Sequence, residues 1–292
     1  MGKLDAFKDF VRPGVPISTL TWLGLGGPIE YLAEPRSEKE LVDVLKVCAE
    51  EGIEARVLGE GSNILASDLG APGVAIRLSE PCFCEIQIES PNVVVGAGVK
   101  IGRLATAVAS AGLGGLEGLI GVPGTVGAGV VANVSTSDAT LGQWVESARV
   151  ATFSGEILEL TQDDFVFGYR SSNLDNVVVL SVKFRLEPDS PEELTRRLQK
   201  FWIVREKTRP EVGGGLARMF QNPRGQKASE LIYEAGFSGA RIGGAFVCEK
   251  NSNLIQTEPG ATSEDVKRLL TLIQTQASER IGVQLERELV IW

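Results

Sequence analysis

The chain has 292 residues, 43% of them hydrophobic, which is enough to bury one large core or two moderate ones. The formal net charge of -9 makes nucleic acid an unexpected partner, because an acidic surface repels phosphates. The absence of histidine excludes Ser-His and Cys-His nucleophilic mechanisms. The four cysteines have no zinc spacing, so we expect reduced thiols and no metal. Without a membrane-length apolar run or a secretory signal, we expect a soluble cytoplasmic protein.

Local patterns in the first part of the chain predict strands mixed with two helices. Ser37 and Glu40 have the spacing of a capping box, which predicts a helix over 37–51 that ends at Gly52. Strands are expected at 55–58, 74–78 and 177–186, and a second helix at 101–111. Two hairpins are expected, from 84–89 with 92–95 and from 147–153 with 156–160. Residues 112–129 contain too many glycines for regular structure.

A helix start at Ser190-Pro191-Glu192-Glu193 marks the expected domain boundary. After it we expect helices near 191–207, 227–235 and 262–281. Short strands are expected at 245–248 and 254–256, and a last strand at 283–292. The fold class is therefore α/β (α+β), with a large first region and a smaller α+β domain.

Two glycine-rich segments could bind an anion. The first glycine loop, residues 59–63, follows a strand and reads Gly59-Glu60-Gly61-Ser62-Asn63. Glycines there allow positive φ, successive backbone N–H groups can point at anionic oxygens, and Ser62 and Asn63 add side-chain donors. An ordinary tight turn is an equally good explanation of this motif alone. The second glycine loop, residues 121–129, has the same character and the same alternative, and neither is a Rossmann fingerprint.

Taken together, several short motifs resemble the UDP-N-acetylenolpyruvoylglucosamine reductase family. They occur in the family's order over about residues 18–292. They include the two glycine loops, Phe167-Gly168-Tyr169-Arg170-Ser171, Phe220-Gln221-Asn222-Pro223, Arg241-Ile242-Gly243-Gly244-Ala245 and Leu285-Glu286-Arg287-Glu288. Each motif is weak alone, whereas the ordered set is specific.

The resemblance implies a fold and a cofactor. The fold is an FAD-binding fold of the vanillyl-alcohol-oxidase/PCMH type at 1–188, with subdomains at about 1–78 and 79–188. A substrate-binding domain follows at 189–292, and its last strand at about 283–292 returns to the flavin. The first glycine loop would cradle the FAD diphosphate, and the second would run beside the flavin. The expected cofactor residues are Gly59, Glu60, Gly61, Ser62, Asn63, Gly121, Pro123, Gly124, Thr125, Gly127 and Asn133.

The resemblance also implies a reaction in peptidoglycan synthesis. NADPH would reduce the FAD, and the enolpyruvyl group of a UDP-sugar would then be reduced. This reduction creates negative charge that an arginine can stabilise, and it requires a proton. Arg170 and Glu288 match the family's catalytic arginine and glutamate. Tyr169, Asn222 and Lys250 are expected to bind the substrate, and the protein is expected to be a monomer.

The sequence departs from the family at the position of the proton donor. The family has a serine or cysteine two residues before the phenylalanine of Phe-x-Asn-Pro, and here that residue is Arg218. Arginine binds anions but donates a proton poorly. Three alternatives follow: an active reductase with another proton donor, an FAD-binding homologue with an altered substrate, or a binding or regulatory protein that has lost the chemistry.

Overall fold

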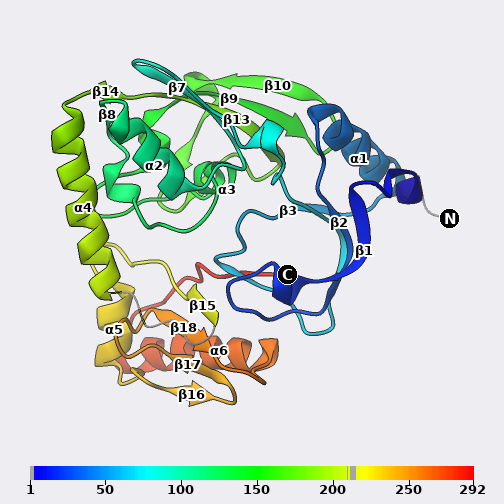
Figure 1. The fold of residues 1–292 in the computed structure, drawn as a ribbon. Helices are drawn as coiled ribbons and strands as arrows, with labels where there is room; N and C mark the ends of the chain where they lie inside the picture. The colour runs from blue at the N-terminus through cyan, green and yellow to red at the C-terminus, as the bar shows by residue number, and fades with distance from the viewer. Residues whose placement is uncertain (1–2, 209, 211–214) are drawn as a thin grey trace. The chain divides into compact units, whose positions relative to one another are not determined.

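The computed structural model describes residues 3–208, 210 and 215–292, which pack into two compact units (Figure 1). Among the described residues, the first unit takes those within 1–13, 31–59 and 72–206, and the second takes those within 14–30, 60–71 and 207–292. Each unit has its own hydrophobic core. No helix among the described residues is long and apolar enough to cross a bilayer.

An antiparallel sheet of five strands is the main sheet of the first unit. Its order is β10-β9-β13-β7-β6. The strands are β6 (Ile86–Glu89), β7 (Asn92–Gly96), β9 (Val145–Thr152), β10 (Ile157–Thr161) and β13 (Val177–Arg185). Both expected hairpins are confirmed, as is the long β-branched strand, whose residues fit a pleated, buried surface.

Helices and short strands complete the first unit. They are η1 (Lys3–Phe7), α1 (Glu38–Glu51), η3 (Pro81–Phe83), α2 (Ile101–Ser110), β8 (Leu113–Gly114), η4 (Glu117–Leu119), α3 (Val126–Val131), η5 (Leu141–Trp144), η6 (Gln162–Asp164), β11 (Phe167–Gly168), β12 (Ser171–Ser172), β14 (Glu187–Pro188) and α4 (Pro191–Thr208). α3 packs against β13 and β7.

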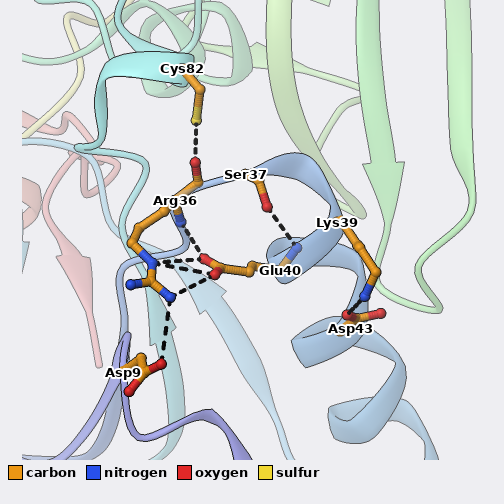
Figure 2. A network of polar contacts seen from close by, with 7 residues as sticks. All are labelled: Asp9, Arg36, Ser37, Lys39, Glu40, Asp43 and Cys82. Atoms are coloured by element: carbon orange, nitrogen blue, oxygen red, sulfur yellow. Dashed lines mark hydrogen bonds and ion pairs between the residues drawn. The ribbon is translucent and has the colours of Figure 1, made fainter.

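The start of α1 differs in one detail from the expected capping box. The Ser37 side chain accepts a hydrogen bond from the Glu40 N–H at 3.2 Å, as expected. The Glu40 carboxylate, however, accepts from the N–H of Arg36 at 2.7 Å and from its guanidinium at 2.8 Å (Figure 2). This guanidinium lowers the pKa of the Glu40 carboxyl. The reciprocal half of the box is therefore replaced by an ion pair one residue earlier.

The expectation that residues 112–129 lack regular structure is wrong for α3. Two glycines of this helix allow close packing. A Cβ on Gly127 would lie 2.8 Å from the Ala97 Cβ, and one on Gly129 would lie 2.9 Å from the Ile101 Cδ1. The glycines therefore allow the helix to pack closely against neighbouring side chains, and this outweighs their low helix propensity.

A four-stranded antiparallel sheet and two helices form most of the second unit. The sheet order is β15-β18-β17-β16. The elements are η2 (Ile17–Thr19), β4 (Ile64–Leu65), β15 (Gly215–Arg218), α5 (Ala228–Glu234), β16 (Arg241–Ile242), β17 (Ala245–Val247), β18 (Leu254–Thr257), α6 (Ser263–Ile281) and β19 (Val290–Ile291). Thr262 and Asp265 form a complete capping box at α6, and the N–H of Thr262 lowers the pKa of the Asp265 carboxyl.

One further sheet has the order β1-β2-β5-β3. Its strands are β1 (Val11–Pro16), β2 (Pro28–Ala33), β3 (Ala55–Val57) and β5 (Ala71–Ile76), and β3 pairs with β5 in parallel. β3 and β5 were expected, whereas β1 and β2 were not. Glycine and proline within β1 hide its strand character in the sequence.

The end of the chain is not the continuous strand that its pattern predicts. Arg287 forms an isolated bridge with Phe220, and only β19 pairs regularly, in parallel with β4. The division into units also differs from the expected boundary near residue 190, because residues 191–206 of α4 pack in the first unit. The two compact units do not show which residues bind the cofactor and which bind the substrate. The limits of the FAD-binding region and of the substrate-binding domain therefore stay a prediction.

Candidate active site

The first glycine loop connects β3 to β4 and is shaped by Gly61. This residue has φ 65°, and a Cβ on it would lie 2.1 Å from the Leu20 carbonyl oxygen. Within the described part of the chain, the backbone N–H groups of Gly61, Ser62 and Asn63 have no protein acceptor. Three successive N–H groups of this kind suit anionic oxygens. The loop therefore fits a phosphate-bearing group such as FAD.

The second glycine loop is fixed by backbone hydrogen bonds and by α4. Gly121 and Gly124 have φ values of 72° and 115°, which glycine adopts without strain. The Gly124 carbonyl accepts from the Ile101 N–H at 3.0 Å, and the Val126 N–H donates to the Val99 carbonyl at 2.8 Å. Pro123 is exposed. The expected cofactor residues of this loop are thus held in one conformation.

Arg205 has a role at the second loop that the sequence did not suggest. The Arg205 guanidinium on α4 donates to the carbonyls of Ile120 and, at 3.1 Å, Gly118. Thr125 precedes α3, and its side chain makes no capping hydrogen bond. A Cβ on Gly59 would lie 3.0 Å from the Thr125 hydroxyl oxygen. Gly59 and Thr125 are therefore neighbours within the first unit.

Arg170 lies in a tight two-residue turn between β11 and β12. Its φ is 56°, a left-handed conformation that costs a non-glycine residue about 1–2 kcal/mol. Its guanidinium carbon is 5.9 Å from the centroid of the Tyr169 ring. Tyr169 is 52% exposed, so the turn presents an aromatic ring and a cation together. Such a pair can bind a planar or anionic ligand.

The Asn133 side chain holds this turn in place. Its Nδ2 donates to the Gly168 carbonyl at 2.7 Å, and its Oδ1 accepts from the Gly142 N–H at 3.1 Å. Asn133 is 6% exposed and has φ 41°. The sequence suggested Asn133 as a cofactor residue, and the structure shows its amide bound to the backbone next to Tyr169 and Arg170.

Arg218 and Glu288 come together in the second unit. The Arg218 Nε is 3.8 Å from the Glu288 Oε1, and the two side chains are 36% and 17% exposed. The Glu288 N–H donates to the Met219 carbonyl at 2.9 Å, which places it beside the end of β15. Glu286, two residues earlier, is exposed. The structure therefore singles out Glu288 as the partly buried carboxylate, with a permanent positive charge beside it.

Asn63 connects the first glycine loop to both of these residues. Its Oδ1 accepts from the Arg218 N–H at 2.8 Å, and its Nδ2 donates to the Glu288 carbonyl at 2.9 Å. Along the chain, Asn63 is separated from Arg218 by 155 residues and from Glu288 by 225 residues. The structure thus brings three of the expected site residues together.

A further asparagine, Asn253, fixes the segment that follows Arg218. It is 1% exposed, its Oδ1 accepts from the Phe220 N–H at 2.9 Å, and its Nδ2 donates to the Phe220 carbonyl at 2.6 Å. The sequence showed only a polar residue before a short strand. The two remaining expected substrate residues lie elsewhere. Asn222 follows Phe220 by two residues, and its Oδ1 accepts from the Ala228 N–H at 3.0 Å. Lys250 is exposed.

Two parts of the chain match known protein families, and these matches define the class of protein. Residues 29–161 match a family model described as FAD binding domain, and residues 211–292 match UDP-N-acetylenolpyruvoylglucosamine reductase, C-terminal domain. A solvent-stable cholesterol oxidase, 17% identical with a TM-score of 0.50 over 61% of this chain and 38% of its own, shares the fold alone. The chain is thus a flavoprotein with a PCMH-type FAD-binding fold.

Proteins that are similar to this chain over nearly its whole length define the family. UDP-N-acetylenolpyruvoylglucosamine reductase of Rhodopirellula baltica is 36% identical over 97% of this chain and 92% of its own. The reductase of Parasynechococcus marenigrum is 36% identical over 95% and 94%. The structure of the Thermus caldophilus enzyme, MurB, matches with a TM-score of 0.83 and 32% identity over 97% and 100%. The chain belongs to the UDP-N-acetylenolpyruvoylglucosamine reductase family.

Proposed function

We propose that this protein is an FAD-dependent, NADPH-using reductase that converts UDP-N-acetylenolpyruvoylglucosamine to UDP-N-acetylmuramate for peptidoglycan synthesis. The observation that carries the proposal is the match to named reductases over nearly the whole chain. We propose that it acts in the cytoplasm as a monomer, with the UDP-sugar and NADPH as its partners and without nucleic acid. The FAD region is residues 1–188, and the substrate domain is residues 189–292.

The two glycine loops would hold the FAD. The N–H groups of Gly61, Ser62 and Asn63 would bind diphosphate oxygens. Gly59, Glu60 and the residues of the second loop would line the cofactor, with Asn133 fixing the neighbouring turn. When bound, FAD supplies the reducing equivalents, which come from NADPH.

The residues of the chain would handle the substrate and its charge. Arg170, held in a strained turn, would stabilise the negative charge that develops on the enolpyruvyl group. Tyr169, Asn222 and Lys250 would bind the UDP-sugar. Glu288 would lie near the carbon that receives the proton. Arg218 would orient the Glu288 carboxylate and attract the carboxylate of the substrate.

A second candidate function is favoured by Arg218 itself. Arginine cannot supply the proton that a serine supplies, and here its guanidinium is directed at Glu288. An FAD-binding homologue with a different anionic substrate, or one that has lost the chemistry, would also keep this arrangement. The first alternative differs from the reductase in its substrate, and the second differs in having no turnover.

The test is a spectrum followed by a kinetic assay. Purified protein should show the visible absorbance of bound oxidised flavin, and anaerobic NADPH should bleach it. NADPH oxidation should then depend on added UDP-N-acetylenolpyruvoylglucosamine. Bleaching without substrate-dependent turnover would favour the altered-substrate alternative, and protein without flavin would contradict the proposal altogether.

A further inference from the structure

The Asn63 side chain makes two contacts that a phosphate ligand does not need. Its carbonyl oxygen accepts the Arg218 N–H at 2.8 Å, and its amide nitrogen donates to the Glu288 carbonyl at 2.9 Å. Both ends of the amide are therefore bound to backbone in the second unit. Ser62, its neighbour in the loop, makes no such contact among the described residues.

The backbone groups that Asn63 binds lie outside regular pairing. β15 is the edge strand of its sheet, and the Arg218 N–H donates to the Asn63 side chain instead of to the partner strand β18. The Leu216 N–H, two residues earlier on the same edge, donates to the Trp22 carbonyl at 3.3 Å. Glu288 lies in the irregular segment before β19. The Asn63 side chain thus supplies the hydrogen bonds that a neighbouring strand would otherwise make to the Arg218 N–H and the Glu288 carbonyl.

The remaining contacts make this arrangement a closed set. The Glu288 N–H donates to the Met219 carbonyl, and the Val290 N–H donates to the Asn63 carbonyl at 3.1 Å. The first glycine loop, the end of β15 and the segment around Glu288 are therefore joined pairwise. A shift of any one segment would break hydrogen bonds to the other two.

We propose that Asn63 is a positioning residue that holds Arg218 and Glu288 at a fixed place relative to the first glycine loop, while the loop's backbone binds the cofactor. This inference rests on the proposed function for its catalytic consequence. It assigns the affinity for FAD to the backbone N–H groups of the loop and the alignment of the ion pair to the Asn63 amide.

Three variants separate this role from phosphate binding by the side chain. Asn63→Ala removes both contacts. Asn63→Asp keeps the acceptor for the Arg218 N–H and removes the donor to Glu288. Ser62→Ala is the matched control in the same loop. Each is measured for amide exchange at Arg218 by NMR, for FAD affinity by fluorescence titration, and for kcat and KM at saturating FAD.

The positioning role predicts a distinct pattern. In Asn63→Ala the Arg218 N–H should exchange about five- to tenfold faster, as expected for one lost hydrogen bond. FAD affinity should change by less than about threefold and kcat should fall by about tenfold or more, because the backbone donors of the loop remain. Asn63→Asp should keep slow exchange at Arg218 and still lose kcat. Ser62→Ala should leave exchange at Arg218 unchanged.

The opposite pattern would overturn the inference. If Asn63→Ala weakens FAD binding by tenfold or more, with wild-type exchange at Arg218 and wild-type kcat at saturating FAD, the side chain is a cofactor ligand. If Asn63→Ala does not fold, exchange in Asn63→Asp decides instead, and fast exchange at Arg218 would contradict the inference. If the wild-type protein has no reductase activity, the proposed function fails. The positioning role of Asn63 is still tested in that case, because amide exchange at Arg218 is measured without turnover.

Discussion

Replacing Asn133 with alanine should destabilise the first unit and loosen the turn that carries Arg170. The variant loses the hydrogen bonds to Gly168 and Gly142. Gly142 is buried, so its N–H is left without water and costs about 1–3 kcal/mol. Gly168 is exposed and can be rehydrated, so its loss is about 0.5–1 kcal/mol.

Backbone conformation adds to this cost. Asn133 has φ 41°, where asparagine is tolerated better than alanine, and the difference adds about 1 kcal/mol. The expected loss in the free energy of unfolding is therefore about 2.5–5 kcal/mol. It is measured by chemical denaturation followed by circular dichroism. Asn133→Gly is the control, because it removes the same hydrogen bonds without the backbone strain and should recover about 1 kcal/mol.

The same variant should lower kcat more than it lowers substrate affinity, because the turn that orients Arg170 is no longer fixed. An Asn133→Ala protein with the unfolding free energy and kcat of the wild type would refute the reasoning. It would show that the Gly168 turn holds its conformation without the amide.

The remaining predictions concern the glycine loop, the two arginines and a buried thiol. Gly61→Ala should abolish FAD binding or folding, because its Cβ would lie 2.1 Å from the Leu20 carbonyl oxygen; normal flavin content would contradict this. Arg170→Ala should lower kcat by orders of magnitude. Arg218→Ser removes the guanidinium beside Glu288 but restores the proton-donating serine of the family, so turnover should be preserved or raised; loss of activity would show that the guanidinium contributes more than a serine hydroxyl can. Burial raises the pKa of the Cys48 thiol from 9.0 to about 11. Stability from the neutral thiol is therefore complete below pH 9 and is lost as pH rises through 11, by up to about 3 kcal/mol. Cys48→Ala should remove that part of the pH dependence in denaturation curves.

Local sequence signals were enough for much of the secondary structure. Ser37 caps the start of α1 and Gly52 caps its end, Thr262 caps the start of α6, and β-branched residues mark β13. These features depend on residues a few positions apart, so a single sequence contains them. The wrong predictions depend on contacts between segments that are distant in the chain. Glycines with a packing role hid α3, and an apolar pattern at 283–292 pairs as a strand only at β19.

The sequence by itself determined the two glycine loops, the order of the family motifs and the unusual arginine at position 218. Only the tertiary structure decided what the asparagines do. Asn63, Asn133 and Asn253 each bind backbone groups of another segment with both ends of the amide. An asparagine side chain can donate and accept anywhere within reach. Its partners are therefore set by which distant segments the fold brings beside it, and no local pattern records them.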